Sequence, residues 1–174
     1  MSTFLTLNFY QMKTLKIFLI IFIASITAAK AQFTKAELQV SGLTCSMCSK
    51  ATEKSLHTLN FIGDIKADLN RNVFVITFKK DVPVNLDQIS KKVEGAGFFV
   101  NNLKATFNFD NVKINNNAFT YGGNSYRLVN GDGKTLAGPV MVTVVDKGFA
   151  PASVYKKYNT TDNVETGRVY HISI

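Results

Sequence analysis

Apolar and polar residues alternate in short segments through the first half of this 174-residue chain. In the first segment, Ala36, Leu38 and Val40 alternate with polar residues, which is typical of a strand with one buried face. The segment at 73–78 is apolar on both faces, which indicates a central strand. The expected strands cover residues 36–40, 65–69, 73–78 and 98–107.

Two helical patterns separate these strands. The first begins near residue 46, where Thr44 or Ser46 can act as the N-cap. The second begins after Asn85, which can cap it, and ends at Gly95. The residues expected on the buried stripe of the first helix are Met47, Ala51, Ser55, Leu56 and Leu59. The order β-α-β-β-α-β over about 75 residues predicts a ferredoxin-like domain with helices on one face of an antiparallel sheet.

The composition shifts after Phe109, where asparagine becomes frequent and glycine pairs mark turns. We find no helical stripe of useful length in this half, so its apolar runs predict strands. These strands are expected at 112–114, 126–129, 140–145, 154–158 and 169–174. The sequence therefore predicts an α+β protein. A ferredoxin-like metal-binding domain covers 32–108, and a small all-β domain, a barrel or sandwich of unknown role, covers 109–174.

The first 31 residues have the features of a signal peptide. Lys13 and Lys16 precede an apolar run, and Ala29-Lys30-Ala31 fits the pattern of a cleavage site. We expect translation to start at Met12 and the mature protein to be exported to a periplasmic or extracellular location. An uncleaved segment would instead anchor the protein in the membrane, and it is the one membrane contact that we expect.

The basic charge of the chain does not indicate nucleic-acid binding. The formal net charge is +8, and removal of Lys13, Lys16 and Lys30 leaves 17 basic residues against 12 acidic ones. The remaining lysine pairs are isolated, whereas a nucleic-acid surface requires a clustered basic patch. The second half also lacks a recognisable catalytic constellation, and we predict that the protein is not an enzyme.

The chain has two cysteines, Cys45 and Cys48, on the turn between the first strand and the first helix. A helix N-terminus lowers the pKa of a thiol, and two thiolates at this spacing either hold a soft metal ion or cycle as a disulfide. A thioredoxin-like exchanger is disfavoured because the chain has no Trp and the element order differs. Two further alternatives stay open: an inert disulfide, and a partner-binding module in which the cysteine pair is incidental.

The segment Gly42-Leu43-Thr44-Cys45-Ser46-Met47-Cys48 resembles the Gly-Met-Thr-Cys-x-x-Cys motif of heavy-metal-associated domains. These domains form small copper chaperones and the N-terminal regions of copper-transporting P-type ATPases. Residues 93–98 resemble the end of the second helix in that family, and the resemblance covers about 33–107. It implies that Cys45 and Cys48 are the metal ligands. Leu43 replaces the family's Met, a swap that conserves volume.

Soft thiolates favour Cu(I), with Zn(II) or another thiophilic ion as the alternative. Two protein ligands leave Cu(I) open to an incoming thiolate, so we predict metal transfer by ligand exchange with a donor or acceptor protein. His57 is expected to be exposed, about two turns along the helix from Cys48, and His171 to be structural. Met47 is expected to pack or to make an exposed contact.

Overall fold

The computed structural model describes residues 32–43, 45–110, 112–130, 136–158 and 168–174. The strands are β1 (Gln32–Ser41), β2 (Ile62–Asp68), β3 (Val73–Phe78), β4 (Phe99–Asn108), β5 (Ala118–Tyr121), β6 (Asn124–Leu128), β7 (Pro139–Val144) and β8 (Val169–Ser173). The helices are α2 (Ser46–Leu56), α3 (Leu86–Gly95) and α4 (Ala152–Tyr158). The predicted signal peptide at 1–31 lies outside the described residues. Within the described ranges, no helix is long and apolar enough to cross a membrane.

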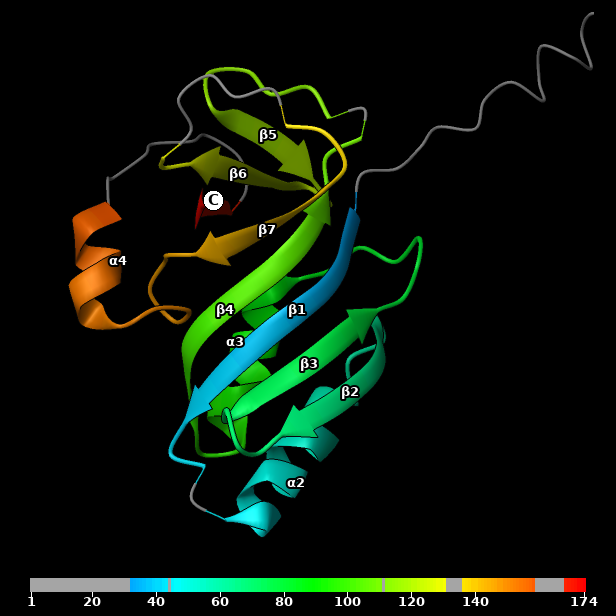
Figure 1. Cartoon of the computed structure of the whole chain (residues 1–174), viewed down its shortest axis with the longest axis vertical. Helices are drawn as coiled ribbons and strands as arrows, with labels where there is room; N and C mark the ends of the chain where they lie inside the picture. Colours follow the sequence, from blue (N-terminus) through cyan, green and yellow to red (C-terminus); the bar gives the residue numbers. More distant parts are fainter. Residues whose placement is uncertain (1–31, 44, 111, 131–135, 159–167) are drawn as a thin grey trace, which may run out of the picture.

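The described strands form one mixed sheet of eight strands in the order β2-β3-β1-β4-β7-β8-β6-β5. Its first four strands, together with α2 and α3, have the predicted βαββαβ order of a ferredoxin-like fold (Figure 1). Strand β7 then pairs with β4 from Leu103 to Asn108, so the second half continues the same sheet. The predicted small all-β domain, a barrel or sandwich, is therefore wrong: its strands join the sheet of the first half, and helix α4 lies among them. The predicted boundary after residue 108 remains a prediction, and the β4–β7 pairing joins its two sides.

Two strands predicted in the second half are wrong. Residues 154–158 belong to helix α4, because the carbonyl oxygen of Pro151 accepts hydrogen bonds from the N–H groups of Val154 (2.9 Å) and Tyr155 (3.1 Å) and starts a helical turn. Residues 112–114 are not in a strand. The strand in this region is β5, which reaches β6 through Gly122 and Gly123, both with positive φ.

A cluster of aromatic rings joins the two halves of the chain into one core. Phe107, on β4, is fully buried, and its ring centroid lies 4.8 Å from that of Phe33 on β1 and 5.0 Å from that of Phe119 on β5. The rings of Tyr126 and Tyr170 stack beside them with centroids 5.1 Å apart. Because these rings come from both halves, each half completes the core of the other.

The second half also contacts α3 through polar groups. The Ser90 hydroxyl donates a hydrogen bond to the carbonyl oxygen of Gly148 (2.9 Å). The backbone N–H of Asp87 donates to the Tyr170 hydroxyl (3.3 Å), and the Asp87 carboxylate lies 3.3 Å from Arg168 Nε. These contacts hold the N-terminal part of α3 against β8 and the turn after β7.

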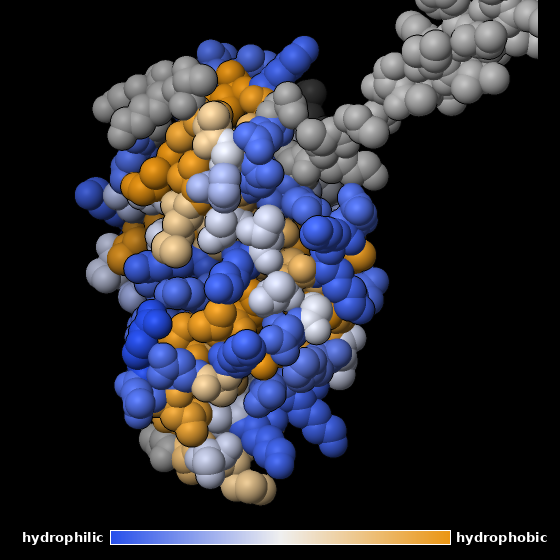
Figure 2. Space-filling view, turned by 45° about the vertical axis from the view of Figure 1, so that its right-hand side comes forward, coloured by the Kyte–Doolittle hydropathy of each residue, from blue (hydrophilic) through white to orange (hydrophobic). Residues whose placement is uncertain are grey.

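Figure 2 shows one face of the molecule, on which apolar patches lie between hydrophilic side chains. Among the described residues, the large apolar side chains with the greatest exposure are Met47, Leu69, Phe99, Met141 and Ile174.

We expect the two halves to unfold together. Ile89 on α3 is fully buried, and truncation to Ala should cost about 2 to 5 kcal/mol. Every tyrosine after residue 31 lies in 109–174, so near-ultraviolet circular dichroism of tyrosine reports on the second half. In urea, Ile89→Ala should shift the tyrosine signal and the far-ultraviolet helix signal by the same amount. A tyrosine transition that stays in place would contradict the shared core.

Buried tyrosines predict a loss of stability in alkali. Burial raises the pKa of Tyr126, and the neighbouring Tyr170, Tyr121 and Asp87 raise it further. The pKa of Tyr126 in the folded state therefore exceeds its value of about 10 in the unfolded state. Below pH 10 the tyrosine is protonated in both states and its contribution to the free energy of unfolding is complete. Above pH 10 the unfolded state loses the proton first, so this contribution falls as the pH rises toward the folded-state pKa. Tyr126→Phe should therefore flatten the decline in the free energy of unfolding above pH 10, as measured by urea titration. An unchanged decline would exclude Tyr126 as its source.

Candidate metal centre

The loop that carries the cysteines leaves β1 at a glycine with a positive φ. Gly42 has φ +88°, a conformation that side chains other than glycine rarely adopt. A Cβ atom at Gly42 would lie 3.5 Å from Cδ1 of Phe98, at the start of the chain that forms β4. Leu43 is half-buried and packs against the core, at the position where the family has Met. The loop is therefore positioned from beneath by its own chain and by the α3–β4 connection.

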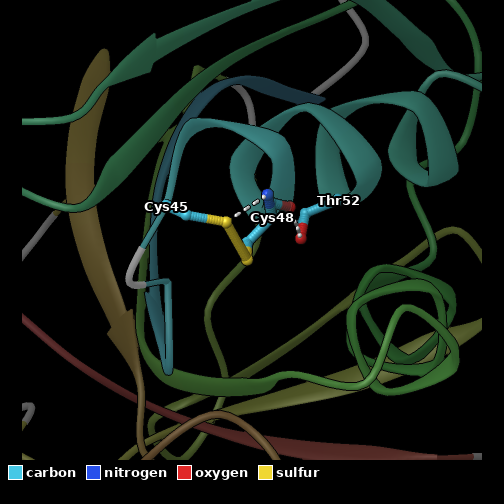
Figure 3. Close-up of a disulfide and its surroundings, with 3 residues drawn as sticks. All are labelled: Cys45, Cys48 and Thr52. Carbon is cyan, nitrogen blue, oxygen red and sulfur yellow. Dashed lines mark hydrogen bonds between the residues drawn. A yellow bond between two sulfur atoms is a disulfide. The ribbon is translucent and has the colours of Figure 1, made fainter.

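Cys45 is the N-cap of α2, in place of the predicted Thr44 or Ser46. Its backbone is extended (φ −145°, ψ 157°), and its sulfur accepts a hydrogen bond from the backbone N–H of Cys48 at 3.2 Å (Figure 3). Sulfur thus takes the role that a Ser, Thr or Asp oxygen usually has at this position. The two Cα atoms lie 5.3 Å apart, and the two sulfurs are joined as a disulfide.

The first turn of α2 is held by a buried hydroxyl that the sequence analysis missed. Thr52 is fully buried, and its Oγ1 donates a hydrogen bond to the carbonyl oxygen of Cys48 at 3.1 Å (Figure 3). The buried face of the helix consists of Ser49, Thr52 and Leu56. The predicted stripe is therefore wrong at Met47, which is 74% exposed, and at Ala51. The sequence signal for this hydrogen bond is the spacing of four residues between Cys48 and Thr52, since a Thr hydroxyl in a helix can donate to the carbonyl oxygen four residues earlier.

The structure brings together the two cysteines and leaves both histidines elsewhere. His57 is the C-cap at the far end of α2, exposed and 3.8 Å from the Glu53 carboxylate. His171 is buried in β8, where its Nδ1 lies 2.8 Å from Asp146 Oδ1. In the part of the chain that the structure describes, no group of three or more His, Cys, Asp or Glu residues could hold a metal ion. The candidate site therefore offers two sulfur ligands.

The local electrostatics favour negative charge on these sulfurs once the disulfide is reduced. Cys45 is exposed and Cys48 is half-buried, at the positive end of the α2 dipole. No acidic residue lies in the first turn of α2 to oppose a thiolate. The Cys48 N–H that now contacts Cys45 sulfur can stabilise charge on the same atom. Reduction of the disulfide would therefore leave both sulfurs in surroundings that stabilise a thiolate.

Residues 37–99 match the family model of the heavy-metal-associated domain. The match to this domain runs from β1 to the first residue of β4 and includes both cysteines. Comparison with curated proteins finds no match.

Solved structures similar to this chain include the CopZ metallochaperone, with 21% identity over 38% of this chain and 98% of that one (TM-score 0.36). A second is the yeast copper transporter domain Ccc2a, studied in apo and Cu(I)-loaded states, with 27% identity over 38% of this chain and 90% of that one (TM-score 0.35). A third is a copper-binding domain of the P-type ATPase HMA7, with 29% identity over 37% and 86% (TM-score 0.34).

The N-cap role of Cys45 predicts different outcomes for two substitutions in the reduced protein. Cys45→Ala removes the acceptor for the Cys48 N–H and should cost about 0.5 to 2 kcal/mol of folding free energy. Cys45→Ser restores an acceptor at the N-cap and should cost less. Urea unfolding with tris(2-carboxyethyl)phosphine present, followed at the helix signal, measures the difference. Equal stability of the two variants would contradict the capping role.

Proposed function

We propose that the protein binds a heavy-metal ion, Cu(I) in first place, through Cys45 and Cys48 and passes it to another protein. The observation that carries this proposal is the cysteine pair at the N-terminus of α2, with Cys45 exposed and Cys48 half-buried, inside the segment that matches the heavy-metal-associated domain. The predicted role is that of a carrier, in which the ion is cargo and no bond in a substrate is cleaved.

The chemistry of the ligand set supports Cu(I). Thiolates are soft ligands that select Cu(I) among the available ions. A structural zinc site normally has four protein ligands, and the described residues supply two at this site. Zn(II) or another thiophilic ion would therefore bind as a transient guest with further ligands from solvent or a partner. Two-sulfur coordination leaves room for the thiolate of a partner, so that the ion can move by stepwise ligand exchange.

Binding requires the reduced form of the pair. A thiol reductant must deliver two electrons and two protons to the Cys45–Cys48 disulfide, which gives two thiols and the oxidised reductant. The two thiols then lose their protons as the metal binds. We propose that the protein works outside the cytoplasm, either after removal of residues 1–31 or anchored to the membrane by them. Disulfides can persist there, so the redox state of the cysteine pair would control when the protein can accept an ion.

Thiol–disulfide exchange is the second candidate, and the disulfide itself is the observation that favours it. In this role a partner's thiolate attacks one sulfur, a mixed disulfide forms, and the other cysteine leaves as a thiolate. Both roles use the same two residues, and the measured product distinguishes them. Metal carriage gives bound metal, whereas thiol–disulfide exchange gives an oxidised or reduced partner protein. The third alternative, an incidental cysteine pair in a partner-binding module, predicts neither product.

We expect the reduced protein to bind one Cu(I) per chain in competition with a chromogenic chelator. Cys45→Ser/Cys48→Ser should weaken binding by at least about a thousandfold because it removes both soft ligands. Met47→Leu is the matched control: it conserves volume next to the site and removes only a thioether, so affinity should stay the same. The oxidised protein should bind no Cu(I).

Equal, weak Cu(I) binding by the wild type and the double variant would contradict the proposal that Cys45 and Cys48 bind and transfer the metal ion. Insulin reduction that turns over and requires both cysteines would then support the exchange role. A reduced wild type that shows neither activity would leave the incidental pair as the remaining alternative.

A further inference from the structure

A cleft lies beside β4, on the side away from β1, between α3 and the turn that follows β7. Its walls are residues 87–94 of α3 and residues 147–150 of the turn, with the first two residues of β4 at its edge. Phe149 is buried at its base, whereas Phe99 is 68% exposed at its rim. The cleft therefore combines apolar surface with the end of a strand.

The strand at this cleft has an unpaired edge. Strand β1 pairs with β4 from Phe99 onward, whereas β7 pairs with β4 only from Leu103 to Asn108. Within the described ranges, no strand pairs with residues 99–102 on the side of β7, and Figure 1 shows the lower part of β4 as a free edge beyond the end of β7. These four residues contain no Lys or Pro, the residues that usually protect an edge. The edge is open to another strand.

The charges around the cleft are mixed. Asp87 lies 3.3 Å from Arg168 Nε, whereas no ion pair between Glu94 and another described residue is present, and Glu94 Oε1 lies 3.2 Å from the neutral Ser90 hydroxyl. Lys91 and Lys147 are exposed, and no ion pair with another described residue is present for either of them. With Asp87 paired to Arg168, Lys91 and Lys147 outnumber the Glu94 carboxylate, and this net positive charge favours a ligand that carries negative charge.

We propose that this cleft binds an extended acidic segment of a partner protein, which adds a strand to β4 along residues 99–102. An extended chain can satisfy the backbone donors and acceptors of the open edge, which a helix cannot do because its own backbone groups are already paired. Acidic side chains would face Lys91 and Lys147, and an apolar side chain would lie on Phe99. A second copy of this chain fits less well, because each copy is itself basic: the full chain has 20 Lys and Arg against 12 Asp and Glu, and 17 against 12 remain without residues 1–31.

The cleft also lies close to the cysteine loop. Phe99 pairs with Ser41, the residue before Gly42, and Phe98 Cδ1 lies 3.5 Å from the position that a Cβ atom at Gly42 would take. A segment bound along 99–102 would therefore hold the rest of its protein near Cys45 and Cys48. The identification of this partner as a metal donor or acceptor rests on the proposed function, whereas the binding of an extended acidic segment does not.

The test uses a fluorescent, terminally blocked peptide of about ten residues in which Glu and Val alternate. The reduced full-length chain should bind it in a polarisation assay, and hydrogen exchange should slow at the amides of residues 99–102. Lys91→Glu/Lys147→Glu should weaken binding at least about tenfold, whereas the matched control Lys66→Glu/Lys80→Glu, on exposed positions of β2 and of the turn after β3, should not. A peptide N-methylated at every residue, which can donate no backbone hydrogen bond on either edge, should not bind.

Several outcomes would overturn the proposal. The first is the absence of binding at millimolar peptide. The second is equal binding of the N-methylated peptide, or of a peptide with Lys in place of Glu. The third is protection from hydrogen exchange at amides outside residues 99–102. Dimerisation of the chain through residues 99–102 would assign the edge to a second copy and would also overturn it. Peptide binding should persist in Cys45→Ser/Cys48→Ser, so failure of the peptide test and failure of the Cu(I) test are separate results.

Discussion

The contact between the Cys48 N–H and the Cys45 sulfur determines where this protein places its two sulfur atoms. It starts α2 at a cysteine, so the proposed ligand atom and the helix cap are the same atom. The helix dipole and the absence of acidic residues in the first turn then favour negative charge at that point. Thr52 is fully buried, and its hydroxyl donates a hydrogen bond to the carbonyl oxygen of Cys48, which fixes the backbone of the other cysteine. The reactivity of the pair therefore follows from the construction of one helical turn.

The second half of the chain supports this turn indirectly. It supplies strands that extend the sheet past β4 and aromatic rings that complete the core around Phe107. It also holds α3 through Ser90 and Asp87, and the chain that leaves α3 passes under Gly42 at Phe98. The second half thus contacts α3, and the chain continues from α3 through Phe98 beside the cysteine loop. The same arrangement leaves the start of β4 unpaired, next to that loop.

The sequence predicted the ferredoxin-like order and the cysteine pair because both depend on local patterns. Asn85 caps α3 as expected, since its side chain accepts from the Gln88 N–H. The sulfur cap at Cys45 was missed because capping signals are defined for oxygen-bearing side chains. Residues 154–158 have β-forming side chains, yet Pro151 starts a helix there. The joining of β7 to β4 depends on contacts between distant residues, which the local pattern does not contain.

X-ray absorption spectroscopy of the reduced, Cu(I)-loaded protein tests the central claim most directly. With no added thiol in the buffer, the metal should have two sulfur neighbours from the protein and no histidine nitrogen. In Cys45→Ser, the two-sulfur signature should be lost while the helix signal of the protein is retained. A copper environment that contains histidine nitrogen, or one that is unchanged by Cys45→Ser, would contradict the assignment of Cys45 and Cys48 as the ligands.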